Sequence, residues 1–276
     1  ANRKGFVLKH VNITEDFDLD YKQAEELITP KTKIVSVSLA GNVLGTINDV
    51  RKIAELAHKV GAVMICDATK AAGHIPINAR KLGCDFLIFS GHKMCGPTGI
   101  GVLYGKAELL DALPPSMFGG GIVEEVDLQE ARWRSAPWKF EAGTPNIAGA
   151  IGLGEAVTYL ENIGVEKIHE YVSGLTGYAI EELGKLGGVK MFTQKDADKN
   201  IGIVAFSVER IHSHDIAEIA GREGVAIRAG HHCAQPLMKE LDISALARAS
   251  FYLYNDKSDV NALVGAIKKA QEIFKV

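Results

Sequence analysis

Hydrophobic positions along this chain follow two patterns: short, continuous apolar runs, and longer segments in which apolar residues recur every three or four positions. The continuous runs predict buried strands at residues 34–39, 62–66, 86–89 and 100–104. A helix is predicted between the first two runs, because Ile53, Leu56 and Val60 share one face and Asn48-Asp49 can cap its start. Nearly unbroken apolar strands separated by helices are typical of a parallel sheet with helices on both faces.

The second half of the chain has a different order of elements. Its patterns predict long helices at residues 146–160 and 165–186, strands at 201–208, 225–229 and 247–254, and further helices at 214–223 and 258–274. We therefore predict an α/β protein of two domains. A large domain with a mostly parallel sheet occupies residues 1–155, and a smaller C-terminal α+β domain occupies residues 156–276.

Residues 119–145 follow neither pattern. The segment begins with three successive glycines and contains both tryptophans of the chain. A connection of this length inside a compact domain is usually functional or interfacial. Because it is also aromatic, we expect it to lie at the subunit interface of a homodimer.

Composition and charge narrow the classes of function. The chain has 276 residues, 47% hydrophobic and 24% charged, with a net charge of −3, so nucleic acid and anionic membranes are not expected partners. No apolar segment approaches the length of a membrane span. The four cysteines lack CxxC or zinc-ligand spacing, which indicates free thiols in a reducing compartment, and we expect a cytoplasmic protein. Cys66 and Cys84, in or beside apolar strands, are expected to be inert core thiols.

The stretch from Phe86 to Gly99 combines an apolar strand with a polar loop that begins Ser90-Gly-His-Lys93. Strands that end in such loops place ligand-binding and reactive side chains at the edge of an α/β sheet. An amine at the mouth of a buried sheet loses hydration, which favours its neutral, nucleophilic form. Lys93 is therefore a candidate Schiff-base lysine, although a lysine after a strand is more often only a surface cation.

Asp67 ends the strand that precedes the lysine strand, and ligands of parallel sheets bind at these carboxyl ends. A carboxylate there suits pyridoxal phosphate (PLP), because it can pair with the ring nitrogen and keep it protonated. The alternative role for Asp67 is to cap a helix, and the two roles are compatible. Ser90 and His92 flank Lys93 closely enough to donate to a phosphate.

Cys233 lies in the loop Arg228-Ala-Gly-His-His-Cys-Ala-Gln-Pro236. An arginine and two histidines near a thiol favour the nucleophilic thiolate, and the glycine and proline of the loop favour exposure. The alternative is a metal site formed by His231, His232 and Cys233. Three adjacent residues cannot readily surround one ion, so this alternative is the weaker one.

Arg248 lies inside a predicted strand, where a charged side chain requires a partner. A planar guanidinium suits a substrate carboxylate bound by two parallel hydrogen bonds. A structural ion pair explains the same residue equally well, and the sequence does not decide between them.

Together these segments resemble the SUF-type (group II) cysteine desulfurases of the fold-type I PLP enzymes. The resemblance covers nearly the whole chain, in family order, through Asn42-Val-Leu-Gly-Thr46, Asp67, His74, Ser90-Gly-His-Lys-Met-Cys-Gly-Pro-Thr-Gly99, Phe140-Glu-Ala-Gly-Thr-Pro-Asn146, Arg228-Ala-Gly-His-His-Cys-Ala234 and Arg248-Ala-Ser250. It implies the fold-type I architecture, with PLP as the cofactor.

The resemblance also assigns cofactor-binding roles. It implies that Lys93 forms the Schiff base with PLP, that Asp67 contacts the pyridine nitrogen, and that Ser90 and His92 hold the phosphate. The family usually has Asp-Gly-Ala-Gln where this chain has Asp-Ala-Thr-Lys, so Lys70 takes the place of a glutamine that contacts the phenolic oxygen. We expect Lys70 either to make that contact as a cation or to turn away.

Gly143 and Thr144 are implied to reach the phosphate of a partner subunit, which makes a homodimer part of the site. The resemblance also implies that about the first third of the family's length is missing from this chain. That part carries a phosphate-binding segment and a histidine that stacks on the ring. Either a separate polypeptide supplies them, or the chain is a fragment with a damaged site.

The remaining implied roles concern the substrate, L-cysteine. Asn42, Arg228 and Arg248 are its predicted binding residues, and Cys233 takes its sulfur as a persulfide while alanine leaves. A SUF-type acceptor protein would then receive the sulfur for iron–sulfur cluster assembly. The alternatives are a related fold-type I PLP lyase or transferase, including a selenocysteine lyase, and a non-catalytic subunit.

Overall fold

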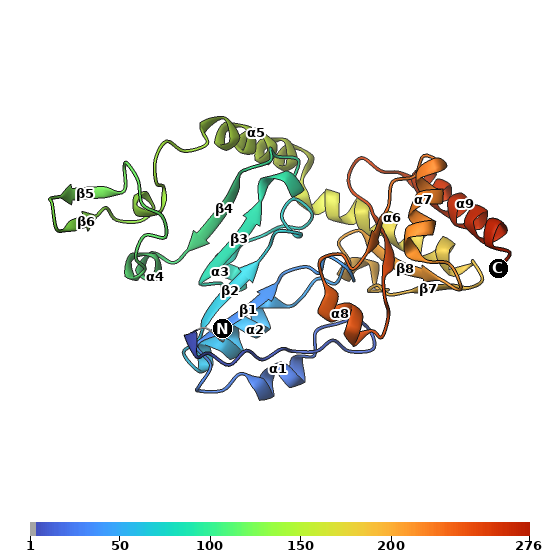
Figure 1. Ribbon diagram of the computed structural model, residues 1–276, viewed down its shortest axis with the longest axis horizontal. Helices are drawn as coiled ribbons and strands as arrows, with labels where there is room; N and C mark the ends of the chain where they lie inside the picture. The colour runs from blue at the N-terminus through green and yellow to red at the C-terminus, as the bar shows by residue number, and fades with distance from the viewer. Residues whose placement is uncertain (1–3) are drawn as a thin grey trace.

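Two β-sheets and a protruding hairpin make up the architecture of the computed structural model, which describes residues 4–276 (Figure 1). The first sheet has the strand order β1-β2-β3-β4, with β1 at Ile34–Ser38, β2 at Val63–Asp67, β3 at Phe86–Ser90 and β4 at Gly101–Gly105. β1, β2 and β3 are parallel, and β4 is antiparallel to β3. The predicted mostly parallel sheet and the α/β class are confirmed.

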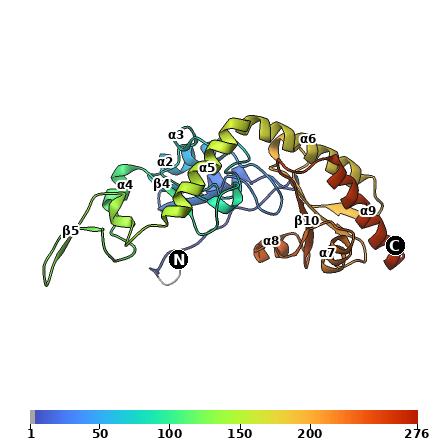
Figure 2. The ribbon, with the colours of Figure 1, turned by 90° about the horizontal axis from the view of Figure 1, so that it is seen from above.

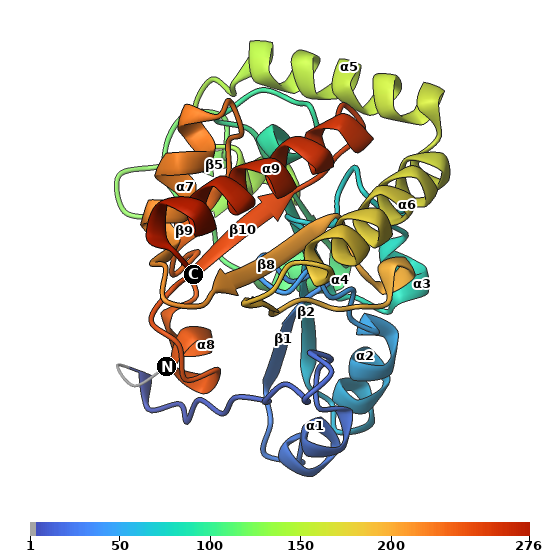
Figure 3. The ribbon, with the colours of Figure 1, turned by 90° about the vertical axis from the view of Figure 1, so that its right-hand side faces the viewer.

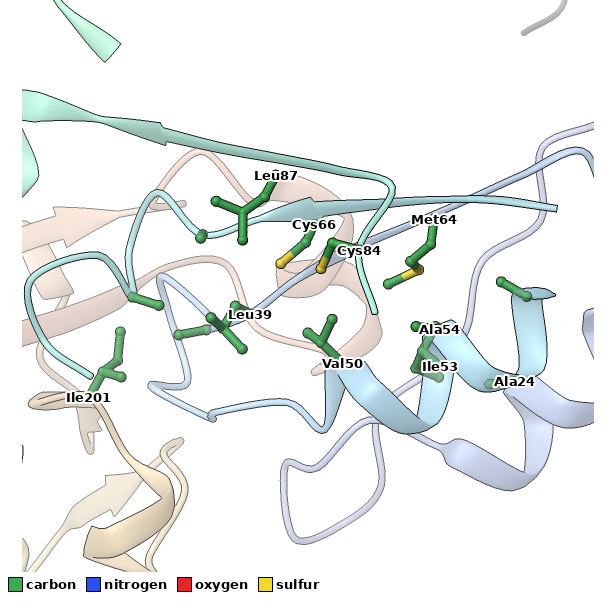
Figure 4. Close-up of a cluster of buried hydrophobic side chains, with 14 of the residues drawn as sticks. Ala24, Leu39, Val50, Ile53, Ala54, Met64, Cys66, Cys84, Leu87 and Ile201 are labelled. Carbon is green, nitrogen blue, oxygen red and sulfur yellow. The ribbon is translucent and has the colours of Figure 1, made fainter. Parts of the chain in front are cut away.

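Short helices connect the strands of the first sheet: α1 at Tyr21–Leu27, α2 at Val50–Lys59, α3 at Ala79–Leu82, the 3-10 turn η2 at Gly91–Lys93 and α4 at Ala107–Ala112. Asp49 caps α2 by accepting a hydrogen bond from the Lys52 backbone N–H, as the sequence predicts. The buried face of α2 packs on Met64, Cys66 and Leu87 of the sheet (Figure 4).

The expectation that helices cover both faces of this sheet is met on one face only. Val63 and Ile65 alternate with the buried residues of β2 and are half-buried. On the two edge strands, Ile34 is 60% exposed and Leu103 is 59% exposed. The apolar strands therefore hold more hydrophobic surface than the described helices cover.

Residues 119–145 form an arm that extends away from both sheets (Figures 1 and 2). The arm contains the antiparallel hairpin of β5 at Val123–Val126 and β6 at Ala131–Trp133, followed by the 3-10 turn η3 at Trp138–Phe140. The sequence pattern does not predict this hairpin, because its strands are short and β5 carries two successive glutamates.

A long helical connection joins the arm to the second sheet through α5 at Ile147–Ile163 and α6 at Val165–Gly184. Gly164 separates the two helices with a φ of +91°, a conformation that glycine adopts without strain. The predicted domain boundary at residues 155/156 falls inside α5, and the division itself stays a prediction. No helix of residues 4–276 is long and apolar enough to cross a membrane.

The second sheet is antiparallel throughout, in the order β7-β8-β10-β9. Its strands are β7 at Val189–Met191, β8 at Ile203–Val208, β9 at Arg228–Gly230 and β10 at Leu246–Ser250, and its further helices are η4 at Ala197–Lys199, α7 at Ser213–Arg222, α8 at Gln235–Glu240 and α9 at Lys257–Phe274. Helices α6, α7 and α9 pack on one face, around Phe206 and Ile267 (Figure 3).

The turn after β1 packs against the other face of the second sheet. Val43 and Leu44 of this turn are buried against Ala205, Met238 and Leu246. This contact joins the two sheets, so residues at the carboxyl edge of the first sheet lie close to β9 and β10 of the second. The pattern-based analysis missed α8 and β7, which are short, and β9 begins at residue 228 rather than 225.

Candidate active site between the two sheets

The carboxyl edge of the first sheet carries Asp67 and Lys93, two central residues of the predicted cofactor site. Asp67 is the last residue of β2, and its Oδ1 accepts a 2.8 Å hydrogen bond from the Thr69 backbone N–H in a tight turn. Lys93 ends the η2 turn that directly follows β3. Because β2 and β3 are parallel neighbours, their carboxyl ends bring the loops of Asp67 and Lys93 to the same edge.

Two lysines at this edge differ in their environment. The side chain of Lys93 is exposed, so the expectation that this amine is desolvated is wrong for the described structure. Lys70 is half-buried instead, and burial together with the positive charges of Arg248 and Lys93 lowers its pKa to about 8. These three cations are therefore near one another, and none of them forms an ion pair with a carboxylate among the described side chains.

The loop that carries Lys93 depends on close backbone packing. Gly91 donates its N–H to Ile100 O at 2.9 Å and accepts from Gly96 N, which folds the loop back on the strand. A Cβ at Gly96 would lie 2.8 Å from the Gly91 carbonyl oxygen, so no larger residue fits at Gly96 without movement. Within this loop, Ser90 Oγ and His92 Nδ1 are 2.8 Å apart, which places a hydroxyl and an imidazole together beside Lys93.

An aromatic pair borders the same region. His74 is buried and stacks on Tyr252, with ring centroids 4.2 Å apart. Burial lowers the pKa of His74 to about 4, with a further contribution from the charge of Lys70, so the imidazole is neutral near pH 7. The Tyr252 hydroxyl donates to Gly73 O at 2.7 Å, which ties the segment after β10 to the turn after Asp67. Sequence reasoning missed Tyr252, because an apolar strand end carries no signal for a long-range contact.

Cys233 lies in the loop after β9 and is exposed, as predicted. Arg228 Nη2 donates to its Sγ at 3.2 Å, an arrangement that stabilises negative charge on the sulfur. His232 contributes no such charge: burial, with the charge of Arg248, lowers its pKa to about 4. The thiol borders a surface hollow of about 470 Å³, whose lining includes His231 and Gln235.

The predicted substrate-binding residues connect this loop to the first sheet. Asn42 Nδ2 donates to the His232 carbonyl oxygen at 2.8 Å, and Arg248 Nη1 donates to the Asn42 carbonyl oxygen at 2.6 Å. Burial lowers the pKa of Arg248, and its buried Nε has no hydrogen-bond partner among residues 4–276. Arg248 forms no ion pair with a carboxylate among residues 4–276, so the alternative of a structural ion pair finds no support in the described contacts.

Gly143 and Thr144 are both exposed, at the base of the hairpin arm. Gly143 has a φ of +80° and donates its N–H to Gly120 O at 2.8 Å. Asn146 Nδ2 donates to Gly99 O at 3.2 Å, which ties the end of the arm to the Lys93 loop. The predicted role of Gly143 and Thr144 is at the phosphate of a partner subunit, and it stays a prediction.

Three or more metal-ligating side chains do not come together anywhere in residues 4–276. The alternative of a metal on His231, His232 and Cys233 therefore has no support in the described geometry. His232 turns inward, and its Nε2 lies 3.0 Å from the Leu246 carbonyl oxygen. Cys233, its neighbour, is exposed instead.

Comparison with known proteins gives a consistent family. The model of the aminotransferase class-V family matches residues 1–263. The chain is 48% identical over 274 residues to a probable cysteine desulfurase from Halalkalibacterium halodurans and 41% identical to a cysteine desulfurase from Haloferax volcanii. It superimposes on the apo structure of a cysteine desulfurase from Thermococcus onnurineus NA1 with a TM-score of 0.92 at 39% identity, over 96% of this chain.

Each match covers a larger share of this chain than of the protein to which it is compared. The two relatives match 99% of this chain but only 67% and 64% of their own lengths, and the Thermococcus structure is covered to 66%. The chain thus spans about two thirds of the length of the proteins it resembles. Within that span the sequence identity, the matched family model and the superposition agree: the chain belongs to the aminotransferase class-V family, with the fold of the cysteine desulfurases.

Proposed function

We propose that the protein is a PLP-dependent cysteine desulfurase that takes the sulfur of L-cysteine onto Cys233. The observation that carries the proposal is the contact between Arg228 and Cys233, because it holds an exposed thiol beside a cation at the junction of the two sheets. Arg248 and Asn42, at the same junction, are linked to this loop by hydrogen bonds. The motif that surrounds Cys233 favours the SUF-type group II class.

The residues at the first sheet's carboxyl edge fit PLP, the cofactor of cysteine desulfurases with this fold. Cations without carboxylate partners suit a phosphate or a phenolate, and a strand-end carboxylate suits a protonated ring nitrogen. Lys93 would hold the cofactor covalently, Asp67 would face its ring nitrogen, and Ser90 with His92 would bind its phosphate. When bound, PLP supplies an electron sink for charge that develops at the substrate Cα.

The chain's own residues then have separable tasks. Arg248 and Asn42 bind the carboxylate of L-cysteine, and Lys93 Nζ takes the proton from Cα. The Cys233 thiolate attacks the substrate sulfur, so that an S–S bond forms while the C–S bond breaks and its electron pair stays with carbon. Protonation of that carbon gives alanine, and Cys233 keeps the sulfur as a persulfide.

The proposed assembly is a homodimer in which Gly143 and Thr144 contribute to the partner's phosphate site. The arm that carries them exposes large apolar side chains, among them Val126 at 62% and Leu128 at 102%. Exposed apolar groups concentrated on one protruding element favour an interface. A SUF-type acceptor protein is the proposed recipient of the sulfur, in the cytoplasm.

The experiment measures alanine and sulfide from L-cysteine with PLP-loaded protein, for wild type and for Cys233→Ala. We expect wild type to form both products and Cys233→Ala to lose sulfide release, while its visible absorption band is unchanged. Cys95→Ala is the matched control, because Cys95 is the other exposed cysteine of the described chain. Full sulfide production by Cys233→Ala would refute the proposal and favour a related lyase.

A further inference from the structure

The loop that presents Cys233 has an unusual backbone. His232 and Cys233 have φ values of +53° and +61°, so two successive residues with side chains occupy the left-handed region. Residues other than glycine are strained in that region and stay there only when the surroundings hold them. Three of the seven such non-glycine residues in the described chain are Cys95, His232 and Cys233, close in sequence to Lys93 or to the proposed thiol itself.

His232 is the residue through which the surroundings hold this loop. Its side chain is buried, with 1% of the residue exposed, and its ring Nε2 lies 3.0 Å from the Leu246 carbonyl oxygen of β10. Its own carbonyl oxygen accepts the 2.8 Å hydrogen bond from Asn42 Nδ2, which comes from the turn after β1. One residue is thus bound by its ring to the second sheet and by its backbone to the first.

The charge state of His232 agrees with this role. A carbonyl oxygen only accepts hydrogen bonds, so the contact with Leu246 assigns the proton to Nε2. Burial and the nearby charge of Arg248 lower the pKa of His232 to about 4, and the ring stays a neutral donor at working pH. A neutral imidazole does not repel Arg228, which is free to bond the Cys233 sulfur.

We propose that His232 is a positioning residue for sulfur transfer, because its ring fixes the strained loop to β10. The Cys233 thiol thereby keeps its hydrogen bond from Arg228 at the junction of the sheets. This inference rests on the proposed function only in that Cys233 receives the sulfur. The geometric part, that the ring of His232 holds the loop, stands independently of the reaction.

The test compares His232→Asn with His232→Gln in the full chain. Asn tolerates the left-handed conformation but is too short to reach the Leu246 oxygen, whereas Gln places an amide N–H near the position of the ring Nε2. Hydrogen–deuterium exchange of the peptide that covers residues 228–236 should speed up about fivefold in the Asn variant, the ratio expected for one lost hydrogen bond. It should return toward the wild-type rate in the Gln variant.

Two further readouts separate positioning from general stability. Exchange in β8, residues 203–208, should be unchanged in both variants, and His10→Asn serves as the control for an exposed histidine. With PLP-loaded enzyme, His232→Asn should lower kcat about fivefold with KM for L-cysteine unchanged, and His232→Gln should recover most of the loss. If His232→Asn fails to fold, Asn42→Asp, which removes the donor to the His232 carbonyl, should speed exchange in the same peptide.

Equal exchange rates for wild type, His232→Asn and Asn42→Asp would overturn the proposal. So would faster exchange throughout the second sheet, or faster loop exchange with kcat unchanged. Failure of the proposed function has a different signature, because exchange of the loop requires neither cofactor nor cysteine. Full sulfide release by Cys233→Ala would refute the transfer of sulfur to Cys233 while leaving the effect of His232 on the loop in place.

Discussion

The two ends of the first sheet differ in whether their charged side chains have partners of opposite charge. At the amino end, Asp85 precedes β3 and is 5% exposed, and its carboxylate is fully partnered. Lys106 Nζ lies 2.6 Å from Oδ1, while the Met64 N–H and His58 Nε2 lie 2.7 and 2.9 Å from Oδ2. This network joins β2, β3, α2 and the residue after β4, and both carboxylate oxygens of Asp85 are engaged within the fold.

At the carboxyl end, the cations have no such partners. The charges of Lys93 and Arg248 both act on Lys70, and none of the three makes an ion pair with a described carboxylate. A fold gains nothing from like charges held together, so their convergence indicates an anionic ligand. The pairing of charges at one end and its absence at the other therefore distinguish the structural end of the sheet from the functional one.

The comparison predicts its largest effect for lysine replacements at opposite ends. Lys93→Ala should lower desulfuration of L-cysteine by about 10²–10⁴-fold, because the proton at Cα loses its acceptor. The melting temperature should be unchanged, since Lys93 is exposed. Lys106→Ala should do the reverse, with a lower melting temperature and an unchanged rate at 25 °C. A comparable loss of rate in both variants would break the distinction.

Replacing Asp85 should have the next largest effect, on stability alone. Asp85→Ala should lower the free energy of unfolding by about 2–3 kcal/mol, because the buried Met64 N–H loses its acceptor and the Lys106 ammonium and the His58 ring lose their partner. Urea unfolding measures the change, with the exposed Glu15→Ala as the control. The visible band of the PLP-loaded protein should be retained, and its loss would place Asp85 in the functional site.

The pH at which each lysine loses its proton sharpens the comparison further. Burial lowers the pKa of Lys70 to about 8, whereas the hydrogen bond to Asp85 raises the pKa of Lys106. Only the neutral amine is acylated, so Lys70 should reach half-maximal labelling near pH 8 and Lys106 only at a higher pH than an ordinary lysine. Peptide mass spectrometry across a pH series gives both midpoints, and equal midpoints would contradict the assignment.

An exposed ion pair should show the smallest effect. Arg51 and Glu55 form an i,i+4 pair on α2, with side chains 72% and 60% exposed. Glu55→Gln should change the free energy of unfolding by about 0.5 kcal/mol or less, because solvent screens the pair. A change as large as that of Asp85→Ala, measured in the same urea series, would show that burial is not what gives the Asp85 network its strength.

Local sequence patterns determined much of the fold by themselves. The apolar runs placed all four strands of the first sheet, and apolar spacing with Asp49 as cap placed α2. These features depend on residues close in sequence, whose periodicity and capping act within one element. The motifs also indicated Asp67 and Lys93 at strand ends, because chain order alone puts the ends of neighbouring parallel strands on one edge.

Only the tertiary structure decided which of the two lysines is the less exposed and which residues hold the thiol in place. Lys70 and Lys93 both follow strands, and their exposure depends on packing by distant segments such as β10. Asn42 and His232 are 190 positions apart, so no local pattern reveals their hydrogen bond. Desolvation and long-range hydrogen bonding are properties of the assembled fold. For that reason the motif was enough to predict a reactive thiol at Cys233, whereas the positioning role of His232 could be inferred only from the structure.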